Sequence, residues 1–314
     1  MATRPDNSSK TAVTVARASV YEAAVCRELA TLNSKPLSEG LYLVASPIGH
    51  LGDVTLRALA VLTNADAVYC EDTRTSQKLL SRYGISRALR TYHEHNAFKI
   101  RGEIIADISN GGRVVLMCDA GTPGISDPGF KLVRAVIEAG GKVISVPGPV
   151  AAVAALTISG IPTDRFLFAG FLNSKSAARK KELQQLAKVP ASLLFYEAPH
   201  RLLAMLTDLI DTLGDRHAVV VRELTKKYEE CKRGQLTELT KWAASAPVRG
   251  ELTIIVAPPS GEPEADITDN IIRQRLLDAL PEAPLSKAAK QVAEELGVSK
   301  KRVYAVGLEL KQNS

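Results

Sequence analysis

The sequence predicts two α/β lobes followed by a small helical domain. Its 314 residues exceed the usual size of a single domain. From Leu41 onward, short apolar runs alternate with segments of helical period, a pattern typical of strand–loop–helix units around a largely parallel sheet. The breaker-rich stretch from Pro258 to Pro263 indicates a linker, and only helical periods follow it. We expect a partly disordered or helical extension over 1–40, lobes over 41–160 and 161–258, and a linker with a helical domain over 259–314.

The first lobe is expected to alternate strands and helices, preceded by an amphipathic helix near Val13 to Leu32. Gly140-Gly141 stops one helix, and Pro147-Gly148-Pro149 ends the strand after it because proline cannot continue a ladder. The strands are expected at 41–45, 67–70, 113–117 and 143–146, and the helices at 55–62, 76–83, 130–139 and 150–158.

The second lobe and the tail follow the same logic. Apolar runs predict strands at 165–171, 192–196, 218–222 and 252–257, with helices at 177–187 and 202–213. Beyond the linker, helical periods cover 271–280 and 286–311, and the second of these is interrupted at Gly297.

Composition narrows the functional classes. The net charge of +6 and the pI near 9.1 permit a polyanionic partner without requiring one. The four cysteines are far apart and form no CxxC pair, which argues against a zinc ribbon or a disulfide framework and favours a reducing, cytoplasmic compartment. The longest apolar stretch, Val150 to Ile158, is too short to cross a membrane, so no membrane association is expected.

The loop from Cys118 to Gly129 is the most informative segment. It follows a buried strand and precedes a helix, where open α/β sheets bind their ligands. Glycines let its backbone approach a ligand, and it contains Asp119 and Asp127 but no lysine or arginine. It is therefore a poor phosphate cradle, and we expect a cationic or polar small ligand. A purely structural double turn is the alternative.

Two further loops also follow strands. The first runs from Ala45 to Asp53, where Asp53 serves equally well as a helix cap, and the other runs from Pro147 to Ala152. Because the carboxyl ends of parallel strands share one edge of a sheet, the three loops predict a single ligand cleft.

Polar residues gather at other strand ends. Glu71 to Arg74 and His93 to Asn96 follow or lie near first-lobe strands, while Tyr196 to Arg201 and Arg222 to Glu230 follow second-lobe strands. Caps and solvated ion pairs explain many such residues equally well. The two histidines lack an evident third ligand, so no metal is expected. Basic clusters at Arg82 to Arg101 and Lys175 to Lys181 suit phosphate contacts or solvated helix faces.

An ordered set of motifs now stands out: Leu43–Gly49, Glu71–Arg74, His93–Asn96, Asp119–Gly129, Pro147–Pro149, Phe195–Arg201 and Arg222–Lys226. From about Leu41 to the chain end, the set resembles the bacterial 16S ribosomal RNA (cytidine-2′-O)-methyltransferases of the tetrapyrrole-methylase (class III) superfamily. The resemblance implies a two-lobed tetrapyrrole-methylase-like fold with S-adenosyl-L-methionine in the cleft between the lobes. It also implies that the substrate is cytidine 1402 of 16S rRNA in an assembled small ribosomal subunit, and that the protein is a homodimer.

The resemblance carries residue roles with it. Cofactor contacts fall on Pro47, Asp119, Ala120, Gly121, Thr122, Ala151 and Ala152. Related methylases have a glycine-rich first loop and Gly-Asp-Pro in the second, whereas Ser46-Pro47-Ile48-Gly49 and Asp119-Ala120-Gly121 stand here. Individual contacts can therefore move by a residue or two.

Transfer to a ribose hydroxyl needs positioning and a base. The candidates that would orient or deprotonate the hydroxyl are Glu71, Asp72, His93 and Glu197, and those that would contact RNA are Arg74, His95, Arg201 and Lys226. Ser286 to Tyr304 resembles a helix-turn-helix, and Lys300, Lys301 and Arg302 open its second helix, where a nucleic-acid reader places such residues. A helical hairpin that only packs on the enzyme is the alternative.

Two other functions remain open at this stage. A small-molecule methylase acting on a porphyrinoid shares the fold and would act without ribosomal subunits. A non-enzymatic DNA-binding regulator built on the C-terminal helices would leave the three glycine loops unexplained.

Overall fold

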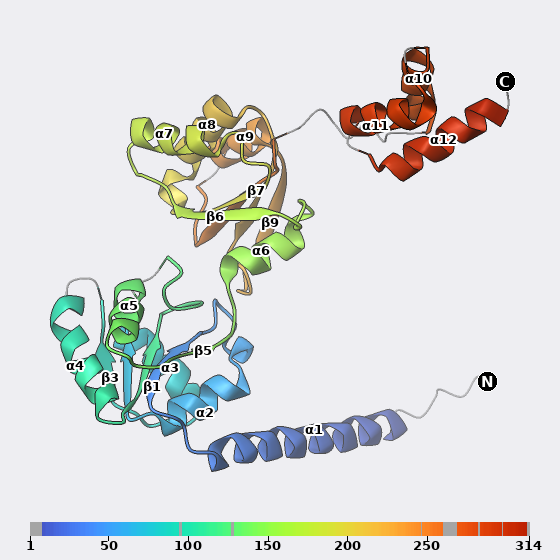
Figure 1. Ribbon diagram of the computed structural model, residues 1–314. Coiled ribbons are helices and arrows are strands. Elements are labelled where there is room, and N and C mark those ends of the chain that lie inside the picture. The colour runs from blue at the N-terminus through green and yellow to red at the C-terminus, as the bar shows by residue number, and fades with distance from the viewer. Residues whose placement is uncertain are drawn as a thin grey trace, which may run out of the picture. The chain divides into compact units, whose positions relative to one another are not determined.

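The computed structural model describes residues 8–93, 96–126, 129–245, 247–259, 269–281, 283–296 and 298–312 (Figure 1). Contacts divide the chain into two units, Met1–Pro258 and Pro259–Ser314. The first unit contains two five-stranded sheets, and the second is helical. This arrangement confirms the α/β fold with a small C-terminal helical domain.

The first sheet is entirely parallel. Its strands lie in the order β3-β2-β4-β1-β5, so the predicted strands are confirmed within a residue or two. Strand β3 was not predicted, because this edge strand is short and two of its three residues are exposed, so it gives no apolar run. The bounds are β1 Gly40–Val44, β2 Ala67–Cys70, β3 Leu89–Thr91, β4 Arg113–Met117 and β5 Val143–Val146.

Helices cover both faces of this sheet. The apolar sides of α2 and α3 pack on one face, and those of α4 and α5 pack on the other. Thr55 caps α2, because its Oγ1 accepts a hydrogen bond from the Ala58 amide at 3.1 Å. The expected cap, Asp53, lies instead in the short helix η1, Leu51–Asp53. The bounds are α2 Leu56–Asn64, α3 Thr73–Arg82, α4 Ala97–Ser109 and α5 Phe130–Glu138, with α4 the helix that was not predicted.

The second sheet is mixed. Its order is β6-β7-β10-β8-β9, and only β6 and β7 are parallel. Strand β9 was not predicted, because its residues are mostly polar and all are exposed or half-buried, and helix α9 after it was not predicted either. The bounds are β6 Phe166–Phe171, β7 Ser192–Glu197, β8 His217–Arg222, β9 Glu230–Gln235 and β10 Leu252–Val256, with helices α7 Ser176–Leu186, α8 Leu202–Leu213 and α9 Leu236–Ser245.

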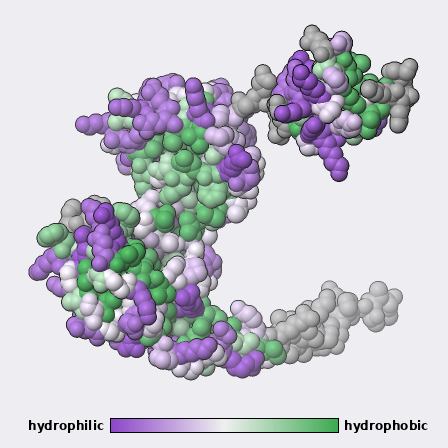
Figure 2. All heavy atoms as spheres, in the orientation of Figure 1, coloured by the Kyte–Doolittle hydropathy of each residue, from purple (hydrophilic) through white to green (hydrophobic). Residues whose placement is uncertain are grey.

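Two apolar cores flank the second sheet. Helices α7, α8 and α9 cover one face, and α6, Ala151–Ser159, packs on the other through Ala152, Ala155 and Leu156 (Figure 1). Figure 2 shows hydrophilic side chains over α7 and hydrophobic ones below it, over the sheet. Because α6 directly follows β5, the chain passes from the first sheet to the second at the third glycine loop.

A buried ion pair joins α7 to α8. The Arg179 guanidinium contacts Asp208 Oδ2 at 2.6 Å, with both side chains almost fully buried. Lys180 Nζ lies 2.7 Å from Asp211 Oδ2. Two of the cations in the Lys175 to Lys181 cluster are therefore neutralised by the fold, and the segment offers less positive surface than its sequence suggests.

Helices also lie at the two ends of the chain. Helix α1, Ser8–Ser34, contacts α2, and Asn64 Nδ2 donates to Asn33 Oδ1 at 2.7 Å. The C-terminal unit consists of α10 Asp269–Ala279, α11 Leu285–Leu296 and α12 Lys300–Gln312 around one shared core. The interruption expected at Gly297 lies outside the described residues.

Candidate active site

The three loops that follow β1, β4 and β5 are fastened to one another. The Ser46 amide donates to Gly121 O at 2.8 Å, and the Gly121 amide donates back to Ser46 O at 3.1 Å. Thr122 Oγ1 then donates to Pro149 O at 3.3 Å. Gly121 has a φ of 85°, a conformation that favours glycine. The predicted meeting of the loops at one sheet edge is therefore present as direct hydrogen bonds.

The second lobe is attached to these loops at two points. The Ala152 amide, in the first turn of α6, donates to the Tyr196 hydroxyl at 3.0 Å. The His50 amide donates to Thr225 Oγ1 at 3.1 Å. Thr225 has a φ of 64° and Glu223 a φ of 51°, conformations that cost free energy for residues with side chains.

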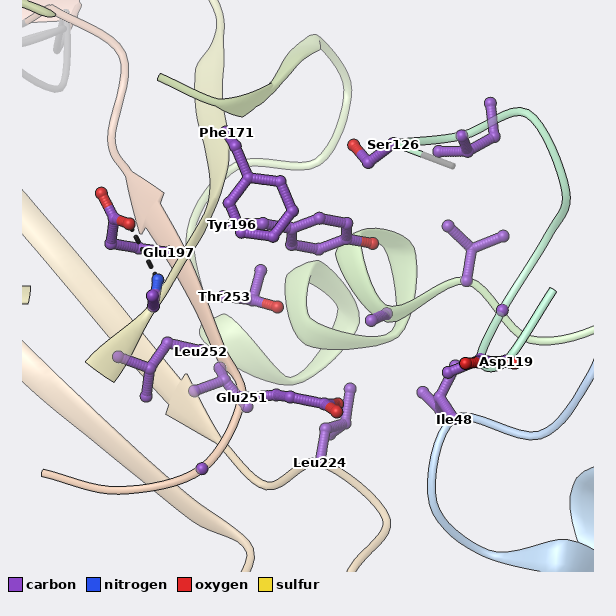
Figure 3. A pocket seen from close by; sticks show the side chains of 18 of the residues that line it. Ile48, Asp119, Ser126, Phe171, Tyr196, Glu197, Leu224, Glu251, Leu252 and Thr253 are labelled. Atoms are coloured by element: carbon purple, nitrogen blue, oxygen red, sulfur yellow. Dashed lines mark hydrogen bonds between the residues drawn. The ribbon is translucent and has the colours of Figure 1, made fainter. Parts of the chain in front are cut away.

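A cavity of ≈ 430 Å³ lies between the two lobes, within the usual size range of small-molecule sites (Figure 3). The first lobe contributes Ile48, Asp119, Ala120, Gly121, Thr122, Ile125, Ser126, Val150 and Ala151. The second contributes Phe171, Tyr196, Glu197, Ala198, Pro199, Val221, Leu224, Gly250, Glu251, Leu252 and Thr253.

The cavity is acidic. Asp119, Glu197 and Glu251 are among the described residues that line it, and no lysine or arginine is. Asp119 Oδ1 accepts a hydrogen bond from the Asp72 amide at 3.0 Å, which orients the carboxylate. Burial raises the pKa of Asp119 above its usual 3.8. These features suit a ligand that carries positive charge and disfavour a phosphate.

Most of the expected cofactor residues lie at the cavity. Asp119, Ala120, Gly121, Thr122 and Ala151 line it. Pro47 and Ala152 are buried and do not line it, whereas Ile48 and Val150 of the same two loops do. The assignment of individual cofactor contacts stays a prediction.

Among the expected bases, Glu71 and Asp72 directly follow β2. Asp72 caps α3 through a hydrogen bond from the Arg74 amide at 2.8 Å, and the Arg74 side chain lowers the pKa of Asp72 to about 2. Asp72 is thus engaged as a cap and an ion-pair partner. Glu71 is exposed and makes no hydrogen bond or ion pair among the described residues, and it lies outside the cavity lining.

Glu197 is a buried member of an ion pair. Its Oε1 accepts from the Ala198 amide at 2.8 Å and lies 3.1 Å from Arg201 Nε. Side chains alternate along a strand, and the neighbouring Tyr196 faces α6, so Glu197 faces the α8 side of the sheet. In Figure 3 its carboxylate lies far from Asp119. This position favours a structural role for Glu197 and Arg201.

The remaining predicted residues are dispersed. His93 is half-buried, and its amide donates to Asn96 Oδ1 at 2.9 Å, whereas His95 lies outside the described residues. Lys226 Nζ contacts Glu223 Oε1 at 3.0 Å and Glu251 Oε2 at 3.2 Å. Arg74 is 87% exposed. In the C-terminal unit, Lys300 and Lys301 are exposed, and Arg302 pairs with Asp269.

Most of the second-lobe wall of the cavity was not predicted from the sequence. Phe171, Leu224 and the segment from Gly250 to Thr253 line the cavity, yet none belongs to a glycine-rich loop. The one feature of the sequence that could have pointed to these residues is their position at or beside the ends of expected strands. Among the described residues, no cluster of three or more histidine, cysteine or acidic side chains could hold a metal, and no helix is long and apolar enough to cross a membrane.

Comparison with known proteins places this chain. The family model described as tetrapyrrole (corrin/porphyrin) methylases matches residues 40–240, and the model of the RsmI C-terminal HTH domain matches residues 264–311. Curated proteins named ribosomal RNA small subunit methyltransferase I match at 47% identity in Mesorhizobium japonicum and 48% in Erythrobacter litoralis. They cover 90% and 89% of this chain and 95% and 98% of those relatives. The chain belongs to this methyltransferase family.

Solved structures agree on the fold. Diphthine synthase gives a TM-score of 0.55 at 18% identity, covering 69% of this chain and 89% of that one. Cobalt precorrin-4 methyltransferase gives 0.54 at 18% identity, covering 69% and 94%. A Thermus thermophilus uroporphyrin-III C-methyltransferase, solved with S-adenyl homocysteine, gives 0.50 at 21% identity, covering 69% and 97%.

Family membership decides several expectations. It confirms the superfamily and the two-lobed fold, and it makes the chain an S-adenosylmethionine-dependent methyltransferase. A non-enzymatic regulator is thereby excluded. The residues present fit the cofactor, because the cavity has the carboxylates of Asp119 and Glu251 on opposite sides and no lysine or arginine among its described lining, which suits a ligand with a sulfonium and an ammonium group.

Gly49→Ala tests the attachment between the lobes. A Cβ at this position would lie 2.6 Å from Thr225 Oγ1 and 3.0 Å from Leu224 O, so the loops must separate. We expect a lower melting temperature and lower turnover. Gly102→Ala is the matched control, because its Cβ meets open space within α4 and should stabilise the protein by about 0.5–1 kcal/mol. Equal melting temperatures for Gly49→Ala and the wild type would contradict the argument.

The affinity for S-adenosylmethionine is expected to depend on pH through Asp119. A cationic ligand binds the ionised carboxylate better, so affinity rises with pH up to the raised pKa of Asp119 and levels off above it. Calorimetric titration from about pH 4 to about pH 8, a range that brackets the titration of a carboxyl with a raised pKa, measures how the affinity depends on pH. Asp119→Asn should bind more weakly and lose it. A mutant with the wild-type pH profile would assign the dependence to another group.

Proposed function

We propose that this enzyme methylates the 2′-hydroxyl of cytidine 1402 in 16S rRNA, acting at the decoding centre of an assembled small ribosomal subunit. The names of the relatives support ribosomal RNA of the small subunit as the substrate class. The observation that carries the proposal is the acidic cavity between the lobes, in a chain that also has exposed basic residues on a helix-turn-helix unit.

The cofactor supplies an electrophilic methyl group on its sulfonium when bound. Asp119 to Thr122 and Ala151 would hold it from the first lobe, and Tyr196, Leu224 and Thr253 would close over it from the second. These loops are already tied together by hydrogen bonds, so the cavity is preorganised. Positioning of the hydroxyl in line with the methyl group supplies much of the rate acceleration.

Removal of the hydroxyl proton needs a carboxylate or an imidazole at the mouth of the cavity. Glu71 fits this role better than the other two carboxylates, because Asp72 is already paired with Arg74 and Glu197 with Arg201. Glu71 also precedes the amide that holds Asp119, so it belongs to the same edge of the sheet. His93 remains the second candidate.

The substrate RNA would meet basic residues outside the cavity. Arg74 is exposed beside Glu71, and Lys300 and Lys301 are exposed at the start of α12. Lys226 and Arg201 are bound to carboxylates of the fold, which makes them weaker phosphate ligands than their sequence motifs suggest. His95 is also proposed to contact RNA, and this proposal is supported only by its place in the His93–Asn96 motif.

The enzyme is proposed to be a cytoplasmic homodimer. Helix α6 leaves Val153 and Ile158 exposed although its other side is buried, which supports a second copy as the cover for this apolar surface. Sedimentation equilibrium measures the mass, and a monomer at micromolar concentration would remove the dimer from the proposal.

Transfer of a tritiated methyl group tests the function. Small subunits from cells lacking this modification should be labelled, and nuclease mapping should place the label on the 2′-oxygen of cytidine 1402. The alternative, a porphyrinoid methylase, predicts labelling of a free tetrapyrrole and none of the subunits. Its structural support is the shared fold alone.

Glu71→Gln is expected to lower turnover by about 10²–10⁴-fold, because the amide cannot accept the hydroxyl proton. The dissociation constant of S-adenosylhomocysteine should stay within about twofold of the wild-type value, because Glu71 does not hold the cofactor. Glu103→Gln, on exposed α4 surface, serves as the control. Wild-type turnover in the Glu71 variant would transfer the role to His93.

The double variant Lys300→Glu with Lys301→Glu tests the C-terminal unit. If α12 contacts RNA, the KM for subunits should rise and its salt dependence should weaken, with cofactor affinity unchanged. Lys188→Glu with Lys241→Glu, two exposed lysines of the first unit, makes the same change of charge. Equal effects of the two double variants would assign the result to net charge.

A further inference from the structure

Phe171 has a large exposed ring in the wall of the cavity. It ends β6, and 57% of its surface is exposed. Its ring centroid lies 5.6 Å from that of Tyr196 in a tilted arrangement, and Phe168 packs edge-on against Tyr196 at 4.8 Å. In Figure 3 the two labelled rings lie together at the second-lobe side of the cavity. The apolar core therefore supports Phe171 through Tyr196 but does not bury it.

The position of Phe171 is fixed from several directions. A register shift between Phe168 and Gly170 bends β6 directly before it. Gly170 has a φ of 64°, and a Cβ there would lie 3.1 Å from Ser126 Oγ of the first lobe. Arg201 Nη2 donates to the carbonyl oxygen of Leu172, the residue after Phe171, at 2.8 Å, and Arg201 is itself paired with buried Glu197. The Glu197–Arg201 pair thus holds the strand end that presents this ring.

The charge of the cavity determines which part of an RNA nucleotide can reach the Phe171 ring. The carboxylates of Asp119 and Glu251 repel the RNA backbone, so the phosphates of the target nucleotide stay outside. The uncharged base and ribose of the target can enter. An exposed aromatic ring is the side chain on which proteins stack unpaired bases.

We propose that Phe171 is the platform on which the base of the target nucleotide stacks, so that its ribose hydroxyl faces the cofactor. This inference rests on the proposed function, because it requires an RNA nucleotide in the cavity. Glu197 and Arg201 act as positioning residues for the platform. A stack of this kind requires the target base to leave its neighbours, as in other enzymes that act on single nucleotides within a nucleic acid.

Substitutions at Phe171 separate base stacking from cofactor binding. Phe171→Ala should lower kcat/KM for small subunits roughly 5- to 150-fold, the range that follows from loss of one base–aromatic stack. Phe171→Tyr and Phe171→Trp should retain most activity, whereas Phe171→Leu should resemble Phe171→Ala. Phe166→Ala is the matched control, because Phe166 is also exposed on β6 and does not line the cavity.

Isothermal titration with S-adenosylhomocysteine is the second readout. The proposal expects unchanged affinity in every Phe171 variant. Weaker cofactor binding by Phe171→Ala, in proportion to its loss of kcat/KM, would make Phe171 a cofactor residue and overturn the proposal. Full activity of Phe171→Leu would overturn it as well. If the wild type fails to methylate subunits while it still binds S-adenosylhomocysteine, the proposed function fails, and the platform fails with it.

Discussion

The bridge between Ser46 and Gly121 is the constraint on which the site depends. It joins the loop after β1 to the loop after β4, although the two residues are 75 positions apart in the sequence. Thr122 extends the connection to the third loop, and Tyr196 extends it to the second sheet. Without this connection, Asp119 and Ala151 would belong to independent loops. With it, they form one wall, and the cofactor does not have to order them on binding.

Charge is partitioned between the cavity and the rest of the molecule. The chain has a net charge of +6, yet the cavity carries carboxylates and no lysine or arginine among its described lining. Several cations outside it are neutralised by specific partners, such as Arg179 by Asp208 and Lys226 by Glu223 and Glu251. The total of 40 lysine and arginine residues therefore overstates the number of basic side chains available to RNA, and exposure identifies the ones that remain.

The sequence predicted the first lobe better than the second for a physical reason. Parallel strands buried on both faces give continuous apolar runs, and the glycine loops after β1, β4 and β5 give strong turn signals. Strand β9 is polar and half-exposed, so its pairing with β8 decides its structure. Asp119 was identified because its loop is distinctive. Phe171 and Glu251 could be identified as cavity residues only from the structure, in which the second sheet faces the first-lobe loops. Glu197 is an ion-pair partner and not an evident base, because the alternation of side chains along β7 turns it away from α6.

The left-handed residues Glu223 and Thr225 bear on how strongly the two lobes are joined. Such conformations cost about 1–3 kcal/mol each, and Thr225 keeps its geometry while its hydroxyl accepts the His50 amide from the first lobe. Part of the free energy of this contact therefore offsets the backbone strain of the residue that accepts it. The hydrogen bond from His50 joins the lobes less strongly than the same bond to an unstrained residue, although the Thr225 amide is also held within the second lobe by Glu229 Oε2 at 2.6 Å.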